Sequence, residues 1–169
     1  GRSSSSGRIT VRHKGGGVKK LYRIIEFSQT RMDSPAKVIA LEYDPNRTAF
    51  IALIEYTDKE RQYVIAPQGL KVGDEINFSR SEHTPLNPGN RTLLKNIPVG
   101  TDIYNVELEP KKGGKLIRSA CSSAQVLAHE EVYTTLKMPS TEVRKFNNEC
   151  FASIGMVSNP ENRFYRVGK

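Results

Sequence analysis

The stretch AKVIALEYDPNRTAFIALIEYTDKERQYVIA, residues 36–66, decides the fold. It contains three short segments rich in β-branched and aromatic residues, at 36–43, 50–56 and 61–66. The first segment alternates between two sets of side chains, as a strand with two different faces does. Asp-Pro-Asn-Arg at 44–47 predicts a turn, because Pro presets φ and Asp and Asn bond to the nearby backbone. A tight polar turn at 58–60 then makes the last two segments a hairpin.

The same pattern continues outward from this stretch in both directions. Segments 22–27 and 75–78 bring the first 80 residues to about five strands, the number of a small barrel. Residues 79–90 are polar and contain two prolines, which favours a linker. A second run of strands is expected at 93–99, 103–108, 124–128, 133–138, 142–146 and 151–157. Strands at spacings of about 8–12 residues predict an all-β protein with little helix.

Nearly all of the net charge lies in residues 1–23. The chain carries +8, from 26 Lys and Arg against 18 Asp and Glu. Seven of the basic residues and none of the acids fall in this segment, which is also rich in Ser and Gly. Glycines let a backbone approach an acidic surface, and Lys and Arg neutralise phosphates. We predict an arm that is disordered alone and ordered on RNA, with a solvated tail as the alternative.

Two further basic features are candidate phosphate contacts. Lysines flank two adjacent glycines and precede an arginine in the cluster Lys111, Lys112, Gly113, Gly114, Lys115 and Arg118. The cluster indicates a backbone in contact with phosphate, with a solvated lysine turn as the alternative. Arg47 either pairs with Asp44 inside its own turn or projects into an RNA groove.

Composition argues against several other classes of protein. No apolar run approaches the roughly 20 residues of a membrane helix. His13, His83 and His129 lack the spacing of a metal site or of a Cys/His pair, so we expect no enzyme, no cofactor and no metal. Cys121 and Cys150 are interpreted as small buried apolar residues in a reducing compartment, with a disulfide between them as the alternative.

Motifs along the whole chain, in order, match one protein family. They include GRIT at 7–10, Arg12-His13, GGG at 15–17, YRI at 22–24, LEYDPNR at 41–47, NIPVG at 96–100, NVE at 105–107, KGG at 112–114 and EVRK at 142–145. EYDPNR is the most specific of these motifs. The chain resembles the RNA-binding domain of the universal large-subunit ribosomal protein two family, in its bacterial and organellar form.

The resemblance implies four regions: a basic RNA-binding arm at 1–23, an oligonucleotide-binding-type (OB) barrel at 24–80, a linker at 81–92, and an SH3-like barrel with a basic tail at 93–169. It implies a structural constituent of the large ribosomal subunit that binds large-subunit ribosomal RNA and neighbouring ribosomal proteins, supports translation and subunit assembly, and has no membrane partner. The RNA contacts carried over by motif are Arg8, Arg12, His13, Gly15, Gly16, Gly17, Lys19, Arg23, Arg47, Lys112, Gly113, Gly114, Lys115 and Arg118.

Other parts of the family pattern have no counterpart in these residues. The family carries a long C-terminal extension with a His-Gly-Gly-Gly loop, and none of the three histidines here replaces that loop's histidine. We expect a separate chain to supply the extension, and the Ser-rich opening favours a ribosome in the mitochondrial matrix. The alternative function is a single-strand RNA-binding or translation factor built on the same barrels, which would stack bases on exposed aromatic residues.

Overall fold

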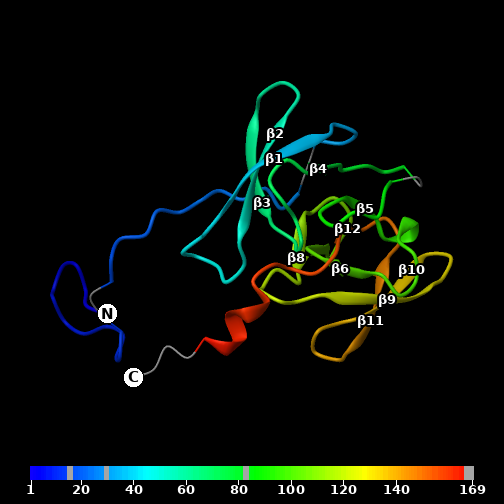
Figure 1. The fold of residues 1–169 in the computed structure, drawn as a ribbon. Coiled ribbons are helices and arrows are strands. Elements are labelled where there is room, and N and C mark those ends of the chain that lie inside the picture. Colours follow the sequence, from blue (N-terminus) through cyan, green and yellow to red (C-terminus); the bar gives the residue numbers. More distant parts are fainter. Residues whose placement is uncertain (15–16, 29–30, 82–83, 166–169) are drawn as a thin grey trace.

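The computed structural model describes residues 1–14, 17–28, 31–81 and 84–165, and its regular elements are almost all strands (Figure 1). The strands are β1 (Ala36–Glu42), β2 (Ile51–Tyr56), β3 (Arg61–Ile65), β4 (Glu75–Ile76), β5 (Arg91–Leu93), β6 (Asp102–Tyr104), β7 (Val106–Glu107), β8 (Gly114–Leu116), β9 (Ala124–His129), β10 (Tyr133–Lys137), β11 (Val143–Asn147) and β12 (Phe151–Ile154). Helical structure in this described part is limited to two 3-10 segments, η1 (Leu94–Asn96) and η2 (Pro160–Phe164). The expected all-β class is confirmed, with curled sheets that fit an OB-type unit followed by an SH3-like unit.

The first unit is a four-stranded sheet in the order β3-β2-β1-β4. β1 and β2 pair antiparallel, and a bulge between Val38 and Ala40 shifts the register of β1. β2 and β3 form the expected hairpin, with Ile51 opposite Ile65 at one end of the ladder. Alternate side chains of the three long strands point inward and pack with Phe78 into one core. The residue pattern that predicted these strands therefore also determines which face of the sheet is buried.

The strand expected at 22–27 is reduced to a single bridge. Ile25 pairs in parallel with Tyr63 of β3, and the Glu26 N–H donates to the Tyr63 carbonyl oxygen at 2.9 Å. The Glu26 carboxylate then accepts the N–H of Ser28 at 2.7 Å. This local side-chain bond turns the chain away from the sheet edge. Within the described residues, the first unit therefore has a four-stranded sheet, with the Ile25–Tyr63 bridge in place of a fifth strand.

The second unit is a six-stranded sheet in the order β11-β10-β9-β6-β12-β5, accompanied by the small β7–β8 pair. Its core includes the fully buried side chains of Ile103, Val126 and Leu136. Two expected strands differ here. Residues 93–99 end β5 and continue as η1, and residues 103–108 are interrupted at Asn105, whose φ of 49° leaves the extended region.

The segment expected as a linker, 81–92, is partly built into the second unit. β5 begins at Arg91 and pairs with β12. Asn90 is buried, and its side chain accepts the N–H of Asn77 at 2.9 Å and donates to the carbonyl oxygen of Pro85 at 2.7 Å. The Gly89 N–H donates to a β12 carbonyl oxygen at 2.9 Å. Residues 89–92 are therefore held by hydrogen bonds to both units.

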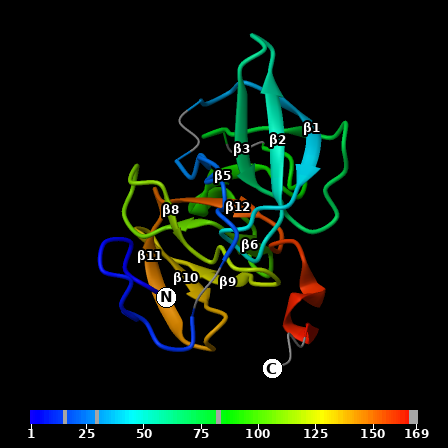
Figure 2. The ribbon, with the colours of Figure 1, turned by 90° about the vertical axis from the view of Figure 1, so that its left-hand side faces the viewer.

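A third apolar core joins the two units, which lie against each other (Figure 1, Figure 2). Ile51 and Ile65 from the first unit pack with Tyr104 and Val157 from the second. Val157 also forms a backbone bridge with Pro67. Apolar burial and backbone pairing across the boundary hold the units in one arrangement.

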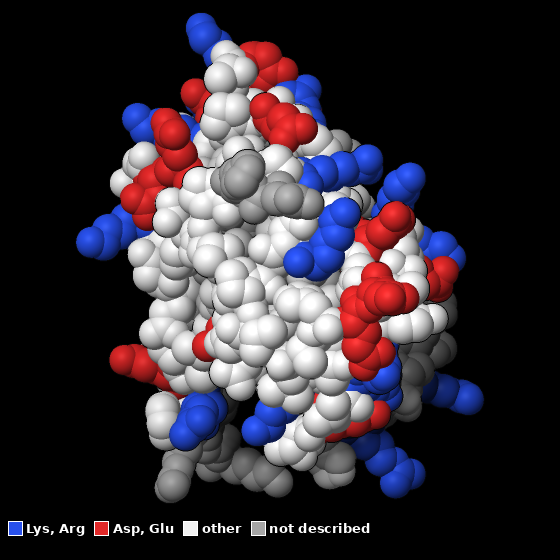
Figure 3. All heavy atoms as spheres, turned by 90° about the vertical axis from the view of Figure 1, so that its right-hand side faces the viewer, with Lys and Arg blue, Asp and Glu red and all other residues white. Residues whose placement is uncertain are grey.

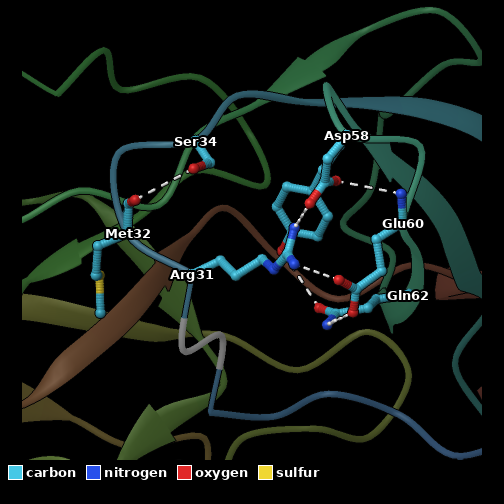
Figure 4. Close-up of polar contacts among 7 residues, drawn as sticks. Arg31, Met32, Ser34, Asp58, Glu60 and Gln62 are labelled. Atoms are coloured by element: carbon cyan, nitrogen blue, oxygen red, sulfur yellow. Dashed lines mark hydrogen bonds and ion pairs between the residues drawn. The ribbon is translucent and has the colours of Figure 1, made fainter.

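Arg31 ties the chain before β1 to the β2–β3 hairpin (Figure 4). Its guanidinium group donates to Asp58 Oδ2 at 2.6 Å and to the Glu60 carboxylate, and its Cζ lies 5.0 Å from the centroid of the Tyr56 ring. The hydrogen bond from Arg31 is the main reason that the pKa of Asp58 is lowered. Because solvent screens these exposed charges, the contact orients the hairpin more than it stabilises the fold.

Both cysteines are free. Cys150 is buried in the second core, and this burial is the main cause that raises the pKa of its thiol to about 11. Cys121 is only half-buried, so the expected burial applies to Cys150 alone. No helix in the described ranges has the length and apolar character needed to cross a membrane.

Candidate nucleic-acid interface

The turn between β1 and β2 places an arginine at the boundary of the two units. Asp44 is completely buried, and its Oδ1 accepts the N–H of Asn46 at 2.8 Å. Its Oδ2 accepts the Nε–H of Arg47 at 2.5 Å. Of the two alternatives considered for Arg47, the structure shows the pairing with Asp44, while contact with an RNA groove stays a prediction for a side chain that is 16% exposed. The Asp-Pro-Asn-Arg turn thus fixes the direction of the guanidinium group.

The ring of Phe27 brings this arginine together with one from the second unit. Arg47 Cζ lies 5.6 Å from the ring centroid, and Arg118 Cζ lies 4.3 Å from it. Both distances fit cation–π contacts. A hollow of about 590 Å³ opens beside the three side chains, and Tyr22, Asn46, Thr48 and Ser119 complete its lining.

The charges around this hollow leave it electropositive. Burial acts most strongly on Asp44 and would raise its pKa, but the hydrogen bonds from Arg47 and from the Asn46 amide together hold the pKa below its usual range. Asp44 is therefore ionised at neutral pH and offsets the charge of Arg47. Arg118 contacts an uncharged ring and donates to the carbonyl oxygen of Gly114 at 3.4 Å, so its positive charge remains available. A hollow with fixed guanidinium groups suits a phosphate group.

The second basic cluster lies in the turn between β7 and β8, in β8 itself and just after it, and its glycines face the protein. The Gly113 N–H donates to Glu107 Oε1 at 3.2 Å, and the Gly114 N–H donates to the carbonyl oxygen of Phe27 at 3.1 Å. Both glycines are buried. Lys112 and Lys115 are exposed, and Lys112 pairs with Glu109 at 2.6 Å. The glycines shape this turn, while the lysines carry its charge.

The arm projects from the side of the molecule that faces the viewer in Figure 2. Arg8, Arg12, His13, Gly17 and Lys19 are exposed there, and a bridge between residues 2 and 9 closes a small loop. Arg23 is half-buried and donates to the carbonyl oxygen of residue 21 at 3.2 Å. Predicted contacts Gly15 and Gly16 lie outside the described residues. The opposite face mixes both signs of charge around a largely uncharged centre (Figure 3).

The structure therefore brings only some of the predicted RNA-contact residues close to one another. Arg47, Arg118 and the basic turn meet near Phe27, and the Asn46 side chain donates to the carbonyl oxygen of Leu21 at the end of the arm, at 3.4 Å. The outer arm, which carries the other described cations of the predicted set, extends away from the two units (Figure 1). Phe27 was not among the predicted contacts, because nothing in the sequence distinguishes it from other strand aromatics. Glu107 was missed as well, since its NVE motif does not reveal that it is buried.

Comparison with known proteins shows which family the chain belongs to. Residues 1–78 match the family described as Ribosomal Proteins L2, RNA binding N-terminal domain, and residues 87–169 match Ribosomal Proteins L2, C-terminal domain. The chain belongs to the ribosomal protein L2 family. It is 53% identical over 161 residues to the large ribosomal subunit protein uL2 of Hyphomonas neptunium. The aligned part is 95% of this chain and 58% of that L2 relative, so the chain spans less than two thirds of the relative's length.

At this site the structure shows groups that can bind an anion. In the part of the chain that the structure describes, no group of three or more His, Cys, Asp or Glu could hold a metal ion. The absence of a metal, a cofactor and an activity stays an expectation from the sequence. What the site offers chemically is positive charge, hydrogen-bond donors and one aromatic face.

Proposed function

We propose that this chain is a structural constituent of the large ribosomal subunit and binds large-subunit ribosomal RNA. The observation that carries the proposal is the meeting of Arg47 and Arg118, one from each unit, at Phe27 beside the end of the basic arm. L2 membership supports ribosomal RNA as the polyanion and the ribosome as the site of action. The chain acts on translation and subunit assembly by fitting and stabilising RNA, with no catalytic step of its own.

Binding rests on charge neutralisation and on shape. The arm's cations neutralise phosphates and release counterions, which supplies affinity without base recognition. Arg47 and Arg118 add guanidinium groups whose directions are already set by Asp44 and Phe27, so they lose less freedom when a phosphate binds. Because such contacts reach the backbone of the RNA, the folded shape of the RNA sets the register.

Replacing Arg118 by Gln tests this site. Loss of one phosphate contact should weaken binding to large-subunit ribosomal RNA about three- to tenfold and reduce the salt slope of the affinity by about one. Arg144→Gln is the matched control, because Arg144 is an exposed arginine on β11 that pairs with Glu142. Filter binding at several salt concentrations measures both variants. Equal losses in the two variants, or no loss in Arg118→Gln, would contradict the proposed site.

Exposed aromatic side chains favour single-strand RNA binding as a second candidate function. Tyr43 is 68% exposed just after β1, and Phe50 is 39% exposed just before β2. If bases stack on this surface, Tyr43→Leu should weaken binding to a single-stranded oligoribonucleotide about tenfold or more. A ribosomal constituent would keep its preference for folded large-subunit RNA in that variant, so a competition experiment separates the two functions.

The compartment and the protein partners form a separate part of the proposal. We propose the mitochondrial matrix, supported by the serine run at residues 3–6, whereas the L2 relative from Hyphomonas neptunium is bacterial and lends it no support. Neighbouring ribosomal proteins are the proposed partners. Copurification of the tagged chain from isolated mitochondria, followed by mass spectrometry, tests the compartment and the partners together.

A further inference from the structure

A buried ion pair lies beneath the basic turn of residues 110–115. The side chains of Arg91 in β5 and Glu107 in β7 are 0% and 2% exposed, and Arg91 Nη2 lies 3.4 Å from Glu107 Oε1. Arg91 Nη1 donates to the carbonyl oxygen of Asn105 at 2.6 Å and to Ser153 Oγ at 3.3 Å. Neither charge reaches the surface, so the pair does not touch RNA itself.

The Glu107 carboxylate is hydrogen-bonded to backbone groups, and two of these belong to the turn. Oε1 accepts the N–H of Gly113 at 3.2 Å, while Oε2 accepts the N–H of Lys111 at 3.2 Å and that of Phe151 at 3.1 Å. Lys111 has a φ of 66° and Gly113 a φ of 77°. The left-handed region is unfavourable for a lysine, so this conformation needs to be held by its surroundings.

Arg91 balances charge more than it shares hydrogen bonds with Glu107. Arg91 Nε and Nη2 have no hydrogen-bond partner among the described residues, although Nη2 is within ion-pair distance of the carboxylate. Burial lowers the pKa of Arg91, and Glu107 is the strongest effect that opposes this shift. A buried carboxylate without such a counter-charge would be strongly disfavoured. Arg91 therefore supplies the counter-charge for the carboxylate that accepts the N–H groups of the turn.

We propose that Glu107, with its charge balanced by Arg91, is a positioning residue that shapes the basic turn for RNA. Its carboxylate holds Lys111 and Gly113 in the left-handed region, which fixes the directions in which Lys112 and Lys115 leave the turn. This inference rests on the proposed RNA-binding function. A turn that is already ordered loses less conformational entropy on binding, so the same two lysines contribute more affinity.

Amide hydrogen exchange tests the positioning without RNA. In the wild-type chain, the Lys111 and Gly113 amides should exchange slowly although the turn lies at the surface. Glu107→Gln replaces one carboxylate oxygen with an NH₂ group that cannot accept a hydrogen bond, so at least one of these amides should exchange about tenfold faster. Unprotected Lys111 and Gly113 amides in the wild-type chain would overturn the proposal.

RNA binding distinguishes positioning from a general loss of stability. The double variant Arg91→Met, Glu107→Gln removes both buried charges at similar volume. Its melting temperature should therefore lie closer to the wild-type value than that of the single variant Glu107→Gln. Its turn amides should still exchange fast, and the salt slope of binding to large-subunit ribosomal RNA should fall by about two, one for each lysine. A double variant with native melting, native exchange at the turn and an unchanged salt slope would show that the pair is only structural.

Glu109→Gln is the matched control, because Glu109 is an exposed acid in the same turn that pairs with Lys112. This variant should leave the exchange of Lys111 and Gly113 unchanged, and accelerated exchange there would contradict the role given to Glu107. If the wild-type chain failed to bind the RNA at all, the proposed function would fall while the exchange results still decided the positioning. The two failures are thus distinguishable.

Discussion

At the scale of the residue, Gly114 allows the basic turn to pack against Asn105. A Cβ atom on Gly114 would lie 2.1 Å from Asn105 Oδ1 and 2.6 Å from the Asn105 carbonyl oxygen. We predict that Gly114→Ala lowers the free energy of unfolding by about 2–3 kcal/mol, because backbone atoms must move to admit the methyl group. Urea unfolding followed by tyrosine fluorescence measures the change.

Gly17→Ala is the control for this substitution. No atom lies within 4 Å of the Cβ that it adds. Its free energy of unfolding should therefore stay within about 0.5 kcal/mol of the wild-type value. Equal effects of the two substitutions would contradict the packing of the turn against Asn105.

The buried carboxylate of Asp44 makes stability depend on pH at the same scale. Folding lowers its pKa, so its stabilising contribution is complete above the unfolded-state pKa and is lost as the pH falls through the folded-state pKa. The difference in unfolding free energy between the wild type and Asp44→Asn should therefore shrink as the pH is lowered from about 7 toward 3. Denaturant unfolding at a series of pH values measures it, with the exposed Asp102→Asn as control. A constant difference across the series would contradict the role of Asp44.

At the scale of the element, the described part of the arm is largely exposed, and the hydrogen bonds of its first loop lie among residues 1–11. A bridge between Arg2 and Ile9 closes its first loop, and Asn46 holds the carbonyl oxygen of Leu21 near its end. We predict fast amide exchange in the free arm and slow exchange on large-subunit ribosomal RNA, because like charges and glycines disfavour order without a polyanion. Protection of the arm in the free chain would refute this prediction.

The basic turn and Arg118 form the second element with a measurable charge effect. Replacing Lys112, Lys115 and Arg118 by Gln should lower the salt slope of RNA binding by about two to three. The matched control replaces the exposed Lys137, Arg144 and Lys145 on β10 and β11, which changes the net charge equally. A slope that falls equally in both triple variants would show that total charge, and not this element, sets the affinity.

At the scale of the whole molecule, the shared core couples the two units. Ile51 is fully buried between them, beside Tyr104 and Val157. We predict that Ile51→Ala lowers the free energy of unfolding by about 2–4 kcal/mol, and that amide protection falls in both units because they unfold together. Val72→Ala, at a side chain that is 61% exposed, is the control. Loss of protection confined to the first unit would show that the units unfold separately.

The sequence predicted most of the strands because their signals are local. Alternation and turn residues identified β1, β2 and β3 closely, and the motifs led to the correct family. The expected strand at 22–27 and the continuous strand at 103–108 were wrong in the structure. In both places a local backbone preference ended the strand, through the Glu26 side chain in one case and the positive φ of Asn105 in the other. Hydrophobic periodicity does not reveal where a local backbone conformation ends a strand.

Local chemistry thus settled the all-β class, the segregation of positive charge into the arm and the turn that holds Arg47, because each depends on neighbours along the chain. Tertiary packing determined the contacts between residues that are distant in the sequence. Phe27 meets Arg118 across 91 positions, and Arg91 lies beneath the turn that Glu107 shapes. Whether a charged side chain is solvated, paired or buried depends on which distant surfaces come together. Only the three-dimensional arrangement of the two units determines those surfaces.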